Sequence, residues 1–147
     1  MFEVIVEGTD GSESATRAVT QAAELAKATG ARLELVCAYT PALESRLKAE
    51  RREAPEDVLW MITPREDADA VLNDAAEIAA QLGVQATSHA REGDPASTIL
   101  DVADDVDADL IVVGNKGMTG ARRFLLGSVP NRISHHAQCS VLIVRTT

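Results

Sequence analysis

Hydrophobic residues follow two spacings along this chain, and the two spacings alternate. Short runs that are apolar throughout or at every second position predict β-strands, because successive strand side chains point to opposite faces. These runs are residues 2–7, 32–39, 84–91, 109–113 and 141–145. Small and aliphatic residues recurring every three or four positions predict helices. The predicted helices contain residues 15–26, 68–82, 96–103 and about 128–137.

Several helix ends are marked by residues with a known capping chemistry. Gly30 follows the first helical pattern, where a glycine permits the left-handed conformation that ends a helix. Asp94 followed by Pro95 predicts an N-cap with proline at the first helical position. Asp10, with Glu13 three residues later, predicts that Asp10 caps the first helix.

The order of elements predicts an open, doubly wound α/β fold. Strands alternating with helices form a parallel sheet with right-handed crossovers and helices on both faces. The chain, residues 1–147, is expected to form one domain, with a charged, proline-interrupted and partly helical excursion at about 40–65. The two most uniformly apolar strands, 2–6 and 109–113, should be central neighbours, which gives the five-stranded order 3-2-1-4-5.

This strand order also predicts where a ligand binds. In open α/β sheets the ligand crevice lies at the carboxyl ends of the strands, where the strand order reverses. Here the reversal falls between the first and fourth strands. The segment GTDGS, residues 8–12, and the glycine-rich loop at 114–128 therefore meet at the expected crevice.

Composition narrows the classes of partner. The chain has 14 Lys and Arg against 23 Asp and Glu, a formal net charge of -9, which disfavours binding to nucleic acid or to an anionic membrane. The first residues lack the basic and apolar regions of a secretory signal, and no apolar run is long enough for a membrane span. Cys37 and Cys139 fall in strand-like segments, which predicts buried thiols and a cytoplasmic location.

The loop GNKGMTGARRFLLGS, residues 114–128, contrasts with this acidity, because it holds four glycines, three cations and no acid. Glycines let backbone N–H groups approach an anion, and a helix start adds a positive dipole, so the loop predicts phosphate binding; a solvated turn is the alternative. The chain lacks both the GK[ST] ending of a Walker A loop and the G-x-G-x-x-G fingerprint of dinucleotide sites.

The spacing Gly114-x2-Gly117-x9-Gly127-Ser128 resembles the nucleotide-binding signature of the universal stress protein family, in its ATP-binding branch. VEGTDGSESATRAV after the first strand and GDPASTIL at the third helix agree with it. The resemblance spans the chain and is weakest at 40–65. It implies a Rossmann-like fold similar to adenine nucleotide alpha hydrolases, a homodimer, and a role in stress response.

The resemblance also implies which residues hold an adenine nucleotide, with ATP the first expectation and Mg²⁺ as an accompanying ion. Asp10 would contact the ribose or base side, Ala38 would lie against the adenine, and 127–129 would hold phosphate oxygens. Lys116, Arg122 and Arg123 are further candidates as phosphate neighbours. The whole nucleotide-binding set is Gly8, Thr9, Asp10, Ala38, Val113, Gly114, Gly117, Gly127, Ser128 and Val129.

Three functions remain open at this point. The first is a nucleotide-binding protein that is non-catalytic or hydrolyses very slowly, because no general base is evident beside the phosphates. The second is a nucleotide hydrolase or adenylyl-transfer enzyme, with Glu7 and Asp10 as crevice acids. The third is an interaction module with an empty crevice.

Other features lead to simpler expectations. The adjacent His135 and His136 point about 100° apart on a helix, so they cannot share a metal, and no zinc-type spacing occurs. His89 alternates outward on an edge strand and is expected to be exposed. The apolar strand 141–145 would form an edge, which pairing with a second copy of the chain would cover.

Overall fold

The computed structural model describes residues 1–40, 65–115 and 127–146, and the predicted excursion lies almost wholly outside these ranges. The strands are β1 Val4–Gly8, β2 Arg32–Tyr39, β3 Ala86–Glu92, β4 Leu110–Gly114 and β5 Ser140–Val144. The helices are α1 Glu13–Thr29, α4 Arg65–Gln81, α5 Pro95–Asp105 and α6 Ser128–His136. Each predicted strand and helix is therefore found, with shifts of a few residues at the ends.

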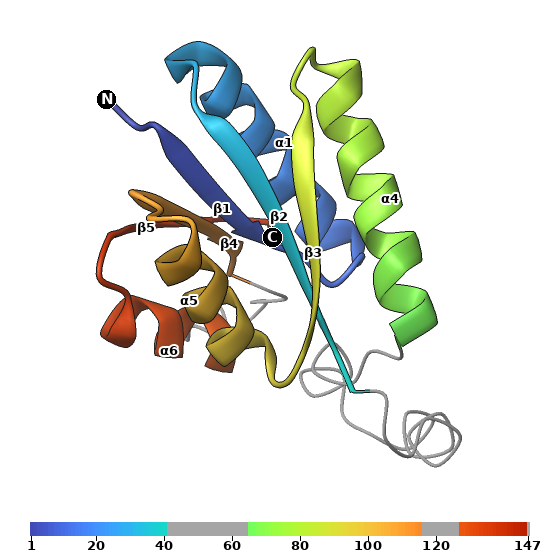
Figure 1. Ribbon diagram of the computed structural model, residues 1–147, viewed down its shortest axis with the longest axis vertical. Coiled ribbons are helices and arrows are strands. Elements are labelled where there is room, and N and C mark those ends of the chain that lie inside the picture. Colours follow the sequence, from blue (N-terminus) through green and yellow to red (C-terminus); the bar gives the residue numbers. More distant parts are fainter. Residues whose placement is uncertain (41–64, 116–126, 147) are drawn as a thin grey trace.

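The five strands form one parallel sheet in the order β3-β2-β1-β4-β5, which confirms the predicted order (Figure 1). In β1, Ile5 is paired with Leu33 of β2 on one side and with Leu110 of β4 on the other. The strand order reverses between β1 and β4, so the carboxyl ends of these two strands mark the topological switch point.

Helices cover both faces of the sheet, with α1 and α4 on one side and α5 and α6 on the other (Figure 1). Ile5 belongs to the apolar cluster shared with α1 and α4, whereas Val6 belongs to the cluster shared with α5 and α6. Because both faces of β1 and β4 are buried, neither strand has a solvent side, and both sequences are apolar almost throughout.

The helix ends confirm two predicted caps and correct a third. Gly30 adopts φ 74° and its N–H donates to the Ala26 carbonyl, and Asp94 accepts from the Ser97 N–H at 3.1 Å. The cap of α1 is Ser12 rather than Asp10. Since Ser12 directly precedes the first helical residue, its hydroxyl accepts from the Ala15 N–H.

Two expectations about side-chain exposure were wrong in part. The His89 side chain is only 19% exposed, with Nε2 3.7 Å from a Glu34 carboxylate oxygen, because β2 and α5 flank the face of β3 on which it lies. Cys37 is buried as predicted, but Cys139 is only half-buried, since it lies just before the edge strand. Within the described ranges, no helix is long and apolar enough to cross a membrane.

Candidate functional site

A crevice opens at the carboxyl ends of β1 and β4, where the strand order places it. Its first part has a volume of about 300 Å³. The described residues that line it are Gly8, Asp10, Ser12, Ser14, Ala15, Val113 and Gly114. Four of the residues predicted to hold the nucleotide therefore come together here, from two strands and the turn between β1 and α1.

A second cavity of about 240 Å³ lies toward the end of β2. Its described lining is Thr9, Asp10, Val36, Cys37, Ala38, Pro95 and Ile99. Asp10 lines both cavities, so this residue lies where they meet. Because most of the remaining lining is apolar, the second cavity suits a flat apolar group such as a base.

The turn after β1 is held so that Asp10 faces the crevice. The Thr9 N–H donates to the Val36 carbonyl at 2.9 Å, which ties the turn to β2. Asp10 accepts from the Ser12 N–H at 3.0 Å, and Gly11 supplies the positive φ of 80° that the turn requires. The Asp10 position is thus fixed by the backbone on both sides.

Gly8 is required by packing rather than by backbone conformation. A Cβ atom at this position would overlap the Ile99 side chain, with Cγ1 only 2.9 Å away. A side chain there would require the Ile99 side chain or α5 itself to move. Glycine therefore lets α5 approach the end of β1 and form one wall of the second cavity.

The start of α6 lies beside the end of β4. Gly127 is its N-cap, and a Cβ atom on Gly127 would lie 3.7 Å from the Asn115 carbonyl oxygen. Val129 is buried in the apolar cluster under α5 and α6, whereas Ser128 is exposed. No described side chain caps this helix start, which carries the positive end of the helix dipole.

The other predicted residues lie outside the described ranges, namely Lys116, Gly117, Arg122 and Arg123. Some lining residues were not among the predicted nucleotide contacts. Ser12 ends the GTDGS segment that was expected at the crevice, and Ser14 follows it at the start of α1, so their position in the sequence was a usable signal. Pro95 and Ile99 gave no such signal, because their contribution depends on how closely α5 approaches β1.

Glu7 was predicted to place a carboxylate in the crevice, and this is wrong. It shares the face of β1 with Ile5, is 0% exposed, and is absent from the described lining of both cavities. Both carboxyl oxygens lack a hydrogen-bond partner among the described residues. Burial, with a smaller contribution from the Asp10 charge, raises the pKa of Glu7 well above its ordinary value. Glu7 is therefore a group of the core, and burial favours its protonated form.

Two further observations limit the chemistry of the crevice. Burial, helped by nearby acids, raises the pKa of the Cys37 thiol to about 12, so it is not a nucleophile at neutral pH. Among the residues with described positions, no group of three or more His, Cys, Asp or Glu is arranged to hold a metal ion. The described site offers one carboxylate, glycines, hydroxyls and a helix start.

The fold and crevice define an open, doubly wound α/β protein with its site at the topological switch point. A family model described as the universal stress protein family matches residues 1–145. The chain belongs to this family.

Individual relatives resemble the chain over nearly its whole length. It is 37% identical to universal stress protein Rv1636 of Mycobacterium tuberculosis H37Rv, over 99% of this chain and 98% of that protein. A crystal structure of a universal stress protein in complex with cAMP is 33% identical with a TM-score of 0.73, and the match covers 99% and 98% of the two chains. A universal stress protein from Archaeoglobus fulgidus is 25% identical with a TM-score of 0.74, over 97% and 98%.

Proposed function

We propose that this chain is an adenine-nucleotide-binding universal stress protein that acts in the cytoplasm during stress. The observation that carries the proposal is the position of Asp10 between two cavities at the switch point, with the start of α6 beside the same strand ends. The relative at 33% identity that was crystallised with cAMP supports an adenine nucleotide as the ligand.

In this proposal each part of the crevice takes one part of the nucleotide. The adenine enters the second cavity against Ala38 and Ile99, and the Asp10 carboxylate accepts hydrogen bonds from the ribose hydroxyls. The phosphates lie along the end of β4 and at the start of α6, where they accept hydrogen bonds from backbone N–H groups of the first helical turn and from the Ser128 hydroxyl. Gly117 and the cations at 116, 122 and 123 belong to the same proposed phosphate path.

We propose binding with no turnover, or with very slow hydrolysis. The enzymatic alternative relied on two crevice acids, Glu7 and Asp10. Because Glu7 is 0% exposed and absent from the described lining of both cavities, it cannot act as a base or ligate Mg²⁺ in the crevice. Asp10 already accepts a hydrogen bond from its own turn, which suits it to holding hydroxyls more than to moving protons.

ATP is the first candidate ligand and cAMP is the second. ATP follows from the long glycine spacing, whose Gly127-Ser128 end lies at a helix start that suits a phosphate chain. cAMP follows from the relative crystallised with it. Only ATP would carry Mg²⁺ on its β- and γ-phosphates, so the dependence of affinity on Mg²⁺ separates the two.

The direct test is to denature the purified protein and identify any released nucleotide, then to titrate ATP, AMP and cAMP calorimetrically with and without Mg²⁺. Asp10→Asn keeps an acceptor for the Ser12 N–H but removes the charge, so affinity should fall about tenfold. Asp101→Asn alters an exposed acid on α5 that is not among the described crevice residues, and it should bind like the wild type. A protein that releases no nucleotide and binds none of the three would refute the proposal.

We also propose a homodimer formed through β5. This strand is at the end of the sheet order, and Leu142 on it is 37% exposed. Antiparallel pairing with a second copy would cover both the apolar side chains and the free strand edge. Light scattering should give twice the chain mass, and Leu142→Lys should shift the protein toward the monomer. A wild type that stays monomeric at high concentration would contradict this.

A further inference from the structure

Helices α5 and α6 begin at the same crevice and pack side by side (Figure 1). Pro95, the first residue of α5, lines the second cavity, and Ser128 is the first residue of α6. Arg132 lies four residues after Ser128, so it occupies the same face of α6 one turn further on. The two helix starts must keep a fixed separation if one ligand is to contact both.

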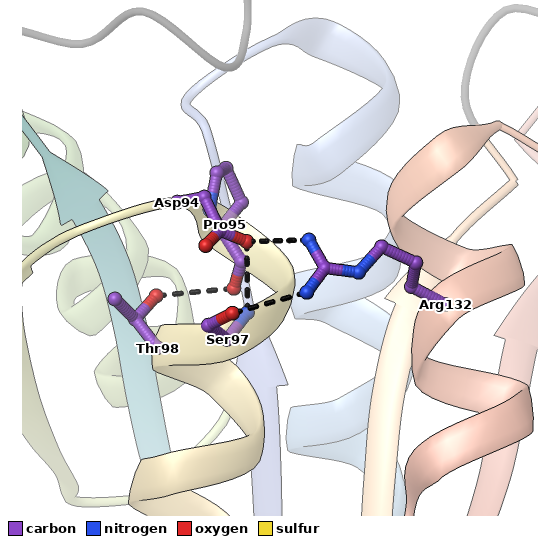
Figure 2. A network of polar contacts seen from close by, with 5 residues as sticks. All are labelled: Asp94, Pro95, Ser97, Thr98 and Arg132. Carbon is purple, nitrogen blue, oxygen red and sulfur yellow. Dashed lines mark hydrogen bonds and ion pairs between the residues drawn. The ribbon is translucent and has the colours of Figure 1, made fainter.

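Arg132 joins the two helix starts through two of its nitrogens (Figure 2). Its Nη1 donates to Oδ2 of Asp94 at 2.8 Å, and its Nη2 donates to the Ser97 hydroxyl at 3.1 Å. The same Asp94 oxygen accepts from the Ser97 backbone N–H at 3.1 Å, which is the N-cap of α5. The guanidinium therefore contacts both residues that set the first turn of α5.

Asp94 is charged at neutral pH and so pairs fully with Arg132. Partial burial acts to raise its pKa, but hydrogen bonds from Ser97 and the charge of Arg132 outweigh this and hold the pKa below its ordinary value. The pair is about half exposed, with side-chain fractions of 51% for Arg132 and 43% for Asp94. An ion pair this exposed adds little to global stability. Its possible role is therefore judged from which parts of the molecule it connects.

A second ion pair on α5 provides an internal comparison. Arg91 Nη2 lies 3.1 Å from Oδ2 of Asp105, with side-chain exposures of 38% and 57%. The pairs match in chemistry and exposure, yet Asp105 is the last residue of α5 whereas Asp94 precedes its first. Only the Asp94 pair joins two helices at the crevice.

We propose that Arg132 is a positioning residue for nucleotide binding. Its contacts with Asp94 and Ser97 fix the start of α6, which receives phosphate, relative to the start of α5, which forms a wall of the adenine cavity. This inference rests on the proposed function and deepens it. Arg132 should matter only for phosphorylated ligands. Adenosine has no phosphate and would contact the cavity beside α5, but not the start of α6.

The test compares adenosine with ATP in matched variants. Asp94→Asn keeps the cap of α5, since Asn is as good an N-cap as Asp, but removes the charge that holds Arg132. Arg132→Gln removes the guanidinium, and Arg132→Lys keeps the charge without the two-pronged contact. Asp105→Asn is the control, because it makes the same substitution at the other pair. Affinities are measured by calorimetry and melting temperatures by circular dichroism.

Asp94→Asn and Arg132→Gln should each weaken ATP binding by about three- to fivefold and leave adenosine binding unchanged. The ATP affinity of Arg132→Lys should lie between that of these two variants and that of the wild type. Asp105→Asn should bind both ligands like the wild type. Asp94→Asn should lower the melting temperature slightly more than Asp105→Asn, because only Asp94 lies at the positive end of the α5 dipole. This difference should be the same whether or not a ligand is present. A loss of ATP affinity at Asp94 without a matching extra loss of stability is the signature of positioning.

Three outcomes would overturn the inference. Tighter ATP binding by Asp94→Asn would mean that Arg132 contacts phosphate directly once released. Equal losses for adenosine and ATP would mean that the pair only supports the fold. Unchanged ATP binding in both variants would mean that the contact has no role. In each case a wild type that binds ATP leaves the proposed function intact, whereas a wild type that binds neither ligand removes both.

Discussion

Two regions of the molecule bury polar side chains. One is Glu7, in the middle of the sheet, which is 0% exposed. The other is the pair Asn115 and Thr146 at the carboxyl edge of the sheet, which are 8% and 5% exposed. The Asn115 side-chain oxygen accepts from the Thr146 N–H at 3.0 Å and from its hydroxyl at 2.9 Å. The Glu7 carboxyl has no such partner among the described residues. Burying a polar group is tolerated when it is hydrogen-bonded and costly when it is not, so the two regions should respond to mutation with opposite sign.

The largest expected effect is at Glu7. Glu7→Leu replaces a carboxyl that has no hydrogen-bond partner among the described residues with an apolar side chain of similar size, beside Ile5, Leu35 and Val112. At pH 5 it should stabilise the protein by about 2 kcal/mol. This corresponds to a rise in melting temperature of about 5–10 °C, measurable by circular dichroism. A fall in melting temperature would mean that Glu7 has a partner that the described residues do not include.

Glu7 also predicts how stability depends on pH. The unfolded carboxyl ionises near its ordinary pKa of 4.5, whereas the folded carboxyl keeps its proton to a much higher pH. As pH rises above 4.5, the unfolded state therefore releases its proton first, and the wild type loses stability until the folded group ionises. The nearby Cys37 remains a thiol throughout this range.

Glu7→Gln isolates this dependence, because Gln is nearly the same shape and does not ionise. The stability difference between Glu7→Gln and the wild type should grow by about 1.4 kcal/mol per pH unit within the window above pH 4.5. Urea unfolding at pH 5, 6, 7 and 8 measures it, and titrating groups that do not interact with Glu7 cancel in the difference. Parallel curves for the two proteins would show that Glu7 is ionised in the folded state.

The partnered region gives a smaller effect of the opposite sign. Asn115→Ala leaves the buried Thr146 N–H and hydroxyl without their acceptor, so it should destabilise the protein by about 1–2 kcal/mol. Asn73→Ala on the exposed face of α4 is the matched control, and its stability should change by less than about 0.5 kcal/mol. If both variants unfold at the same urea concentration, the hydrogen bonds between Asn115 and Thr146 do not stabilise the protein.

The fold could be predicted because the hydrophobic patterns and helix caps in the sequence agree with the strand order and layers of the folded protein. The run that follows Asp109, residues 110–113, is apolar on every residue, as expected only if both faces of the strand are covered. This requirement led to the central pairing of β1 with β4 that the structure has. Gly30 ends α1 through its left-handed backbone conformation, and Asp94 begins α5 through a side-chain oxygen that accepts from the Ser97 N–H. Both signals are local and need no tertiary information. The position of the crevice followed from the strand order alone.

The parts that were not predicted depend on contacts between distant residues. Arg132 and Asp94 are 38 positions apart and meet only because α5 and α6 pack together. Ile99 enters the second cavity only because Gly8 lets α5 approach β1. Glu7 was misplaced for another reason: its alternation with Ile5 does assign it to the core face, but a carboxylate beside a predicted site was interpreted as functional.

The smallest expected effect is at Thr146, and it tests whether the Asn115 region acts as a unit. Thr146→Val removes the hydroxyl but keeps the N–H and nearly the same volume, so it should cost about 0.5–1 kcal/mol. If the hydroxyl contributes only through Asn115, the same substitution should cost almost nothing when Asn115 is already Ala. The double-mutant cycle therefore measures the coupling directly. Additive losses would show that the Thr146 hydroxyl contributes through contacts other than Asn115. The hydrogen bond from Arg17 to the Thr146 carbonyl is not one of them, because the substitution leaves it in place.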